Sequence, residues 1–292
     1  MDIAIHLGAH CTDDDLLLKT LARNADALAA DGVVVPSAGR VRPAIRKAMQ
    51  ARGGSLMPGG GPTLVDELLD GVADPEGARR MILSYEGFLG TYAKVLAGTT
   101  LYADAGRRAE TLRDLFPGHS VAFFIAIRNP ATFVPALFEA SSVDTFEAFI
   151  AGQDLSRMTW STPLAAIRDA CPEVPLTVWC NEDLPLLWPE ILRETADVET
   201  PLDGEDAILR DVMTATGFHR LETYLRDNPA PDLSTHRKVM TAFLGKYADE
   251  AKIDQEIALP GWSEEMIAGL SALYEADLER IRARDDITFI QP

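Results

Sequence analysis

Short apolar runs recur along the chain, and the segments between them are longer and amphipathic. The runs are rich in Val, Ile, Leu and Phe on both faces, which is typical of strands buried in a parallel sheet. The predicted strands are Ile3 to Leu7, Val33 to Val35, Arg80 to Ser84, Val121 to Ile127 and Leu176 to Trp179. Helical patterns lie between them, at Asp14 to Ala30, Thr63 to Val72, Arg107 to Phe116 and Ala131 to Ala140. This alternation predicts a three-layer α/β fold, with helices on both faces of a central parallel sheet of about five strands.

The last third of the chain, from about residue 181 to residue 292, is almost wholly helical in pattern and ends in a predicted helix from Ser263 to Arg284. No long linker interrupts it. We therefore expect one domain over residues 1 to 292, in which the C-terminal helices pack on the sheet. The stretch from Arg52 to Pro62, RGGSLMPGGGP, has five glycines and two prolines and is predicted to be a loop.

Composition excludes several classes of partner. Hydrophobic residues make up 47% of the 292 residues, which is enough to fill a sizeable core. The net charge of −18, from 27 basic and 45 acidic residues, repels nucleic acid and anionic membranes over the whole surface. No apolar run approaches the roughly 20 residues that span a bilayer. We expect neither nucleic acid nor a membrane as a partner.

The three cysteines, Cys11, Cys171 and Cys180, are an odd number without paired spacing. The N-terminus has neither the cationic region nor the apolar core of a signal peptide. Together these features predict reduced thiols in a cytoplasmic protein.

The turn after the first strand, GAHCTDDD from Gly8 to Asp15, carries three consecutive aspartates. A strand, a tight turn and a helix form the layout of many phosphate-binding folds, because a helix N-terminus attracts anions. Here Thr12 is expected to cap the helix, with Asp15 at the reciprocal position of a capping box. A diphosphate roughly 5 Å from these charges would be repelled by about 3 kcal/mol per charge pair at an effective dielectric near 20. The residues favour a self-satisfied helix cap, and a rearranged anion-binding turn is the alternative.

A second alternative for this turn is a divalent metal site, made by His10 together with Asp13 or Asp14. Consecutive acids on a helix point about 100° apart, so at most two of them can share one ion. In this interpretation His10 is a candidate catalytic residue of a metal-assisted hydrolysis. His6 alternates along the strand and is expected in the core or at a sheet edge.

Four segments together resemble the bacterial sulfotransferase family. The opening segment matches at Gly8, Thr12, Leu21, Asn24, Leu28, Gly32, Val33 and Pro36. MILSYEGF (Met81 to Phe88) is similar to the family's strand ending in Ser-x-Glu, and FFIAIRNPATFVPALFE (Phe123 to Glu139) to its R-x-P segment. LYEADLERI (Leu273 to Ile281) is similar to a C-terminal helix of these proteins. The resemblance implies a P-loop-type α/β fold that binds the sulfuryl donor 3′-phosphoadenosine 5′-phosphosulfate (PAPS).

This chain departs from the family pattern at the positions that bind the donor. The family's lysine is replaced by Cys11, its Gly-Thr-Thr by Asp13, Asp14 and Asp15, and a serine that meets the 3′-phosphate by Ala136. The cofactor-binding positions that the resemblance still assigns are Gly8, Thr12 and Arg128. Arg128 is alternatively the partner of one of the many excess acids.

Glu86 follows a predicted strand and would face the crevice in which open α/β sheets bind ligands. The resemblance implies that Glu86 is a general base for a hydroxyl acceptor. The alternative is that Glu86 is an ordinary acid of the loop. A basic run, comprising Arg40, Arg42, Arg46, Lys47 and Arg52, is either a solvated helix face or a site for an anionic glycan or an acidic protein. Trp179 and Trp188 are expected in the core.

Two functions follow. The first is a sulfotransferase-like protein that has lost its PAPS loop and, without a cofactor, binds a small molecule, a glycan or a protein. The second is an active sulfotransferase or another group-transfer enzyme, which acts on a hydroxyl group and binds PAPS or its product 3′-phosphoadenosine 5′-phosphate (PAP). Fold analogy alone does not choose between them.

Overall fold

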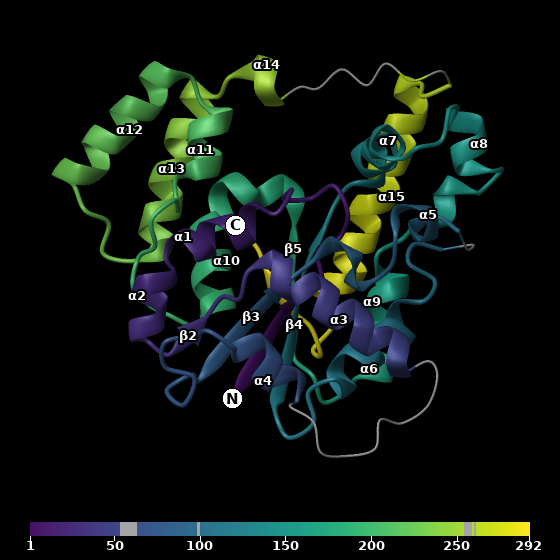
Figure 1. The fold of residues 1–292 in the computed structure, drawn as a ribbon. Helices are drawn as coiled ribbons and strands as arrows, with labels where there is room; N and C mark the ends of the chain where they lie inside the picture. Colours follow the sequence, from purple (N-terminus) through teal and green to yellow (C-terminus); the bar gives the residue numbers. More distant parts are fainter. Residues whose placement is uncertain (53–62, 98–99, 254–258, 260) are drawn as a thin grey trace.

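The computed structural model describes residues 1–52, 63–97, 100–253, 259 and 261–292, and it confirms the α/β fold (Figure 1). One parallel sheet has the strand order β2-β3-β1-β4-β5-β6. Its strands are β1 (Asp2–His6), β2 (Val33–Val34), β3 (Arg80–Ser84), β4 (Ser120–Ile127), β5 (Leu176–Cys180) and β6 (Thr288–Ile290). All five predicted strands are present. The three-residue β6 was not predicted, because it lies in the last third of the chain, whose pattern is almost wholly helical.

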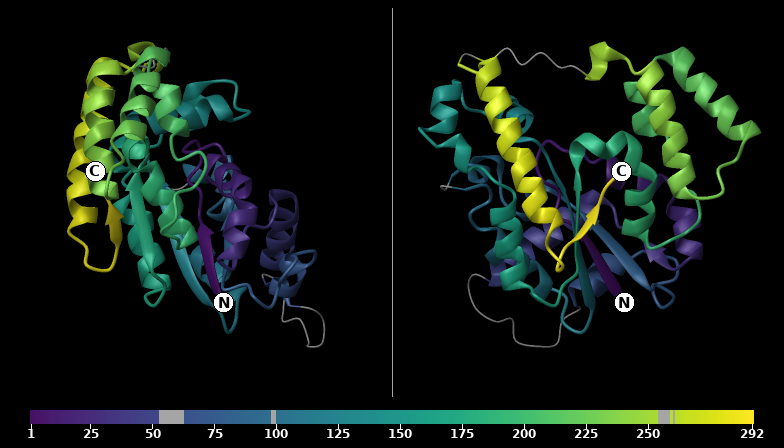
Figure 2. Two further views of the ribbon diagram at one scale, coloured as in Figure 1. Left: turned by 90° about the vertical axis from the view of Figure 1, so that its left-hand side faces the viewer. Right: turned by 180° about the vertical axis from the view of Figure 1, so that it is seen from behind.

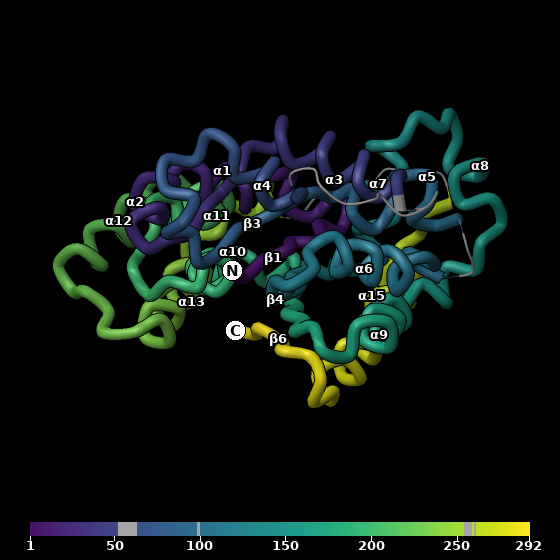
Figure 3. Tube along the Cα trace, turned by 60° about the horizontal axis from the view of Figure 1, so that its bottom comes forward, coloured from purple at the N-terminus to yellow at the C-terminus, as the bar shows by residue number. Residues whose placement is uncertain are grey.

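Helices cover both faces of this sheet, as Figure 3 shows along the strands. One face is covered by α3 (Ala38–Arg52), α4 (Leu64–Leu69), α6 (Ala105–Asp114), α7 (Pro130–Ala140), α9 (Ser161–Ala170) and α15 (Glu264–Arg282). The other face is covered by α1 (Leu16–Arg23), α2 (Ala25–Ala30) and α10 (Leu184–Ala196). The central strand β1 divides its side chains between the two cores: Ile3 and Ile5 lie in the first and Ala4 in the second. This alternation explains why the strands are apolar on both faces.

The single helix predicted from Asp14 to Ala30 is wrong, because the chain forms two helices that meet at Asn24. The Asn24 amide nitrogen donates to the carbonyl oxygens of Thr20 (2.9 Å) and Asp203 (2.8 Å), and its oxygen accepts from the Asp203 backbone N–H (2.8 Å). A residue 179 positions away therefore sets the break. Periodicity within one segment does not reveal such a contact.

The remaining helices lie around the upper part of Figure 1. They are α5 (Tyr92–Val95), α8 (Phe146–Ile150), α11 (Ala207–Val212), α12 (Ala215–Asp227), α13 (Leu233–Tyr247) and α14 (Glu250–Ile253), with short 3-10 turns at η1 (Glu86–Phe88), η2 (Leu155–Arg157) and η3 (Asn181–Asp183). Of the C-terminal helices, α10 and α15 pack on the sheet, and Figure 2 shows α15 leading back into β6. Helices α11 to α13 surround a small cluster of their own, which includes Leu209, Phe218 and Met240.

All four tryptophans are buried, with at most 6% of each exposed. The core positions expected for Trp179 and Trp188 are confirmed, and none of the four presents a ring for a sugar to stack on. The predicted loop from Arg52 to Pro62 lies outside the described residues from position 53 onward. Within the described ranges, no helix combines the length and the apolar character needed to cross a membrane.

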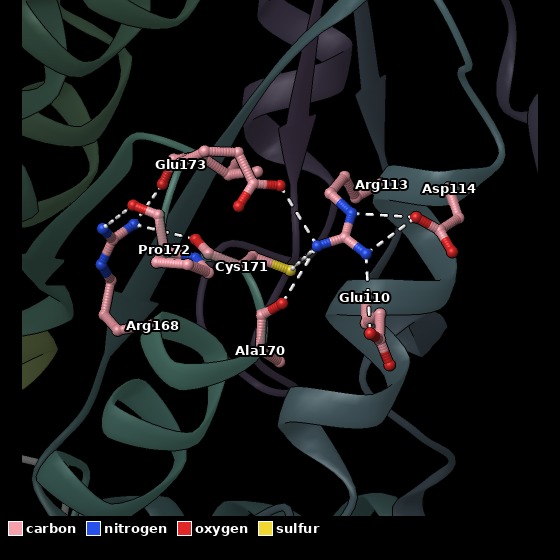
Figure 4. A network of polar contacts seen from close by, with 9 residues as sticks. Glu110, Arg113, Asp114, Arg168, Ala170, Cys171, Pro172 and Glu173 are labelled. Carbon is pink, nitrogen blue, oxygen red and sulfur yellow. Dashed lines mark hydrogen bonds and ion pairs between the residues drawn. The ribbon is translucent and has the colours of Figure 1, made fainter.

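Two arginines fix the turn that leads from α9 into β5 (Figure 4). Arg113 of α6 donates to the Ala170 carbonyl oxygen (3.0 Å) and the Glu173 carboxylate (3.1 Å). Arg168, 9% exposed, donates to the carbonyl oxygens of Cys171, Pro172 and Val174. Carbonyl oxygens of the turn thereby gain hydrogen-bond partners, and this network closes the amino-terminal end of β5.

Candidate functional site

The candidate site lies at the carboxyl ends of β1, β3 and β4, where the fold changes direction. The chain leaves β1 toward the face of α1, but it leaves β3 and β4 toward the opposite face, where α6 and α7 lie. In open α/β sheets such a switch point is where ligands bind. The loops after these three strands carry Gly8, Glu86 and Arg128, so the structure brings these predicted site residues to one edge of the sheet.

Gly8 lets the first two of these loops approach closely. Its φ of +58° lies in the left-handed region, and a Cβ atom there would be only 2.8 Å from the backbone N and Cα of Glu86. Both features require glycine. Gly8 therefore fixes the position of Glu86 through the backbone.

The capping box predicted for Thr12 and Asp15 is wrong. The Thr12 hydroxyl donates instead to the Ala9 carbonyl oxygen (2.6 Å), and helix α1 begins only at Leu16. The Asp13 carboxylate accepts from the Leu17 backbone N–H at 2.9 Å, so Asp13 satisfies the helix N-terminus. The turn extends further than the sequence indicated, because Cys11, Asp14 and Asp15 all adopt positive φ angles. Aspartate tolerates that conformation better than most residues.

Two arginines from other elements close this turn. Arg42 of α3 donates to the Asp15 carboxylate at 2.5 Å, which gives one member of the basic run an internal partner. Arg128 donates through one terminal nitrogen to the Cys11 carbonyl oxygen (2.5 Å) and through Nε to the Thr132 hydroxyl (3.1 Å). Arg128 therefore binds the backbone of the turn, and neither the predicted ion pair with an acid nor a ligand is needed to account for these two bonds.

Cys11 occupies the position at which the family resemblance expects a lysine. Its thiol is partly buried, and burial raises its pKa to about 11, with a smaller opposing effect from a hydrogen bond to Tyr92. The thiol is therefore protonated near neutral pH. It offers a ligand neither the positive charge of a lysine nor the nucleophilicity of a thiolate.

Glu86 lies in η1 at the mouth of the site and accepts a hydrogen bond from the Tyr92 hydroxyl at 3.2 Å. Burial raises the pKa of Glu86, and the bond from Tyr92 opposes this shift. A half-buried carboxylate with a raised pKa at a switch point is chemically suited to accept a proton. Tyr92 itself was not predicted, because nothing in its local sequence links it to a carboxylate six residues earlier.

The His10 side chain is buried in the protein interior. It is 1% exposed, its Nδ1 lies 2.9 Å from the Tyr102 hydroxyl, and its backbone N–H donates to the same hydroxyl (3.0 Å). The Tyr92 ring contacts its edge, with the ring centroids 4.4 Å apart. With these neighbours His10 is a core residue, and its two contacts with the Tyr102 hydroxyl anchor the turn. His6 is likewise a core residue, 1% exposed beneath the same turn.

The metal site predicted from His10 and the aspartates does not form. Within the part of the chain that the structure describes, no group of three or more His, Cys, Asp or Glu side chains is arranged to hold a metal ion. The physical reason is that the Asp13 carboxylate is bonded to the Leu17 amide and Asp14 is exposed, whereas the His10 ring is buried and bonded to Tyr102.

The buried His10 makes stability depend on pH. Burial lowers the pKa of its imidazole from 6.5 to about 4 in the folded protein. Between these values the unfolded chain binds a proton that folded His10 excludes, so the free energy of unfolding falls as the pH is lowered from 6.5 toward 4, by up to about 1.4 kcal/mol per pH unit. We expect urea unfolding of His10→Gln to show a shallower pH dependence than wild type. The exposed His219→Gln serves as the control, and equal slopes for wild type and His10→Gln would contradict the assignment.

Compared with protein-family models, curated proteins and solved structures, the chain matches none of them significantly. By its fold and its site, the chain is a parallel α/β protein with polar residues at the switch point of its sheet. Function is therefore inferred from the geometry of the site itself.

Proposed function

We propose that this protein is a non-catalytic binding protein built on a sulfotransferase-like α/β fold, in which the PAPS-binding loop has become a closed structural turn. One observation carries the proposal. Two oxygen atoms of the turn, from the Asp15 carboxylate and the Cys11 carbonyl, accept hydrogen bonds from Arg42 and Arg128. An anion at this turn would have to displace these bonds.

The residues at the turn do not fit the donor. PAPS carries several negative charges, and its recognition needs unpaired N–H groups and cations. The Asp13 carboxylate already accepts from the Leu17 amide, Cys11 supplies no charge, and Asp14 is exposed at the mouth of the turn. A diphosphate would face carboxylates where the family presents lysine and hydroxyl groups.

Calorimetric titration with PAP at low salt tests this proposal. We expect no measurable binding up to about 1 mM, which corresponds to a binding free energy weaker than about 4 kcal/mol. A micromolar dissociation constant for wild type, abolished in Arg128→Ala and retained in the exposed control Arg157→Ala, would overturn it.

A second candidate is group transfer to a hydroxyl acceptor with Glu86 as the general base. The raised pKa of Glu86 and its contact with Tyr92 favour this function. If Glu86 is the general base, Glu86→Gln should abolish group transfer to the hydroxyl acceptor. PAP should still fail to bind, because the group donor would be a compound other than PAPS.

A further inference from the structure

A hollow lies beside the switch point, between α3 and α6. It has a volume of about 780 Å³ and is bounded by described residues of α3, α6 and the η1 turn. These two helices lie side by side in Figure 1. Both pack into the core on the face of the sheet opposite α1. Pockets that bind small molecules typically fall in the range of about 300–1,000 Å³.

The floor of the hollow is apolar and shaped by close contacts. Ile45 and Phe88 are each 1% exposed, and Met49 and Tyr85 also contribute to this floor. The Tyr85 ring lies directly over Gly87, where a Cβ atom would be 2.4 Å from the ring. Glycine at this position therefore lets the aromatic ring lie flat in the wall of the hollow.

The rim of the hollow is cationic at the end nearest the switch point. Arg46 projects from α3, and Arg107 and Arg108 project from α6. Arg108 donates to the carbonyl oxygens of Phe88 (2.6 Å) and Gly87 (3.1 Å), which joins η1 firmly to α6. Among the described residues, Arg46 donates a hydrogen bond to the Tyr85 hydroxyl alone, at 3.4 Å.

Two of these three cations have no acidic partner among the described residues. Acidic residues outnumber basic ones by 45 to 27, yet among the described residues no carboxylate forms an ion pair with Arg46 or Arg108. Arg107, by contrast, pairs with Asp104 at 3.1 Å. The acids that line the hollow, Glu110 and Asp114, lie toward the other end of α6, beside Arg113.

We propose that this hollow binds a small amphipathic anion, with an aromatic or aliphatic body on the Ile45–Phe88 floor and a carboxylate, sulfonate or monoester head at Arg46. The inference rests on the proposed binding function and supplies its ligand class and its site. The apolar floor favours a ligand with an apolar body over a glycan, and a hollow of this size suits a small molecule better than the face of a protein. Charge-assisted bonds to the head group fix the ligand's orientation.

Two fluorescent probes test the proposal. 8-Anilino-1-naphthalenesulfonate carries an aromatic body and a sulfonate, and N-phenyl-1-naphthylamine carries the same body without the charge. We expect the sulfonate to bind at one saturable site and Arg46→Gln to weaken it at least tenfold. Lys47→Gln is the matched control, because Lys47 is the next residue of α3, is exposed and does not line the hollow. It should change the affinity less than twofold, and neither variant should alter binding of the neutral probe more than twofold.

Thr111→Trp, which fills the hollow from α6, should abolish binding of both probes. Equal affinities in Arg46→Gln and Lys47→Gln, or unchanged sulfonate binding in Thr111→Trp, would overturn the assignment. The proposed function fails separately, because PAP binding that depends on Arg128 would contradict it whatever the two probes do.

Discussion

Replacing Asp277 by alanine is expected to destabilise the protein by about 4 kcal/mol, because this side chain supports three donors at once. Asp277 of α15 is 2% exposed and accepts from the backbone N–H groups of Trp160 (2.7 Å) and Ser161 (3.0 Å) and from the Ser161 hydroxyl. It thereby caps α9 from another helix. Alanine leaves two amides of the α9 N-terminus without an acceptor.

Urea unfolding followed by circular dichroism measures this loss. Glu279→Ala is the matched control on the same helix, because the Glu279 side chain is 76% exposed and pairs only with Arg282 among the described residues. It should change the free energy of unfolding by less than about 0.5 kcal/mol. A similar small change for Asp277→Ala would show that water replaces the cap.

Gly8→Ala is expected to cost about 3 kcal/mol and to displace the loop that carries Glu86. The added Cβ would lie 2.8 Å from two backbone atoms of Glu86, and the φ of +58° adds strain for any side chain. Backbone atoms cannot move aside as a flexible side chain can, so the loops after β1 and β3 must separate.

Gly39→Ala provides the control for this substitution. Gly39 lies in α3, and a Cβ atom there would have no neighbour within 4 Å. Since alanine favours a helix, we expect Gly39→Ala to stabilise the protein by up to about 1 kcal/mol. Equal effects at positions 8 and 39 in unfolding experiments would refute the close approach of the two loops.

The strands were predictable because each is a continuous apolar run, and burial on both faces imposes that pattern on any parallel sheet. Several helix termini were also predictable: Thr63 caps α4 and Ser263 caps α15 through contacts within four residues. The break at Asn24 was not, since its partner Asp203 belongs to a distant segment. A hydrogen bond within a few residues can be recognised from the local sequence, whereas a bond to a distant segment cannot.

The site shows the same division. The sequence suggested Glu86 from its position after a strand, and Gly8 and Arg128 through the family resemblance, and the sheet brings all three together. It did not reveal that Arg128 binds the Cys11 carbonyl oxygen, that His10 turns inward to Tyr102, or that Arg42 reaches Asp15. Each of these contacts joins separate elements, and the direction of a side chain in a turn depends on backbone angles that composition does not specify.

By itself, the sequence determined the α/β class, the position of five strands and the acidic character of the first turn, because each depends on hydrophobic periodicity or on a count of charges. Only the tertiary structure decided that the turn closes on Arg42 and Arg128, and that Arg46 and Arg108 border a hollow without a carboxylate partner in the part of the chain that the structure describes. The physical reason is that charge balance at a site is set by which groups lie within about 4 Å of one another. That proximity arises from the crossing of helices and strands far apart in the chain.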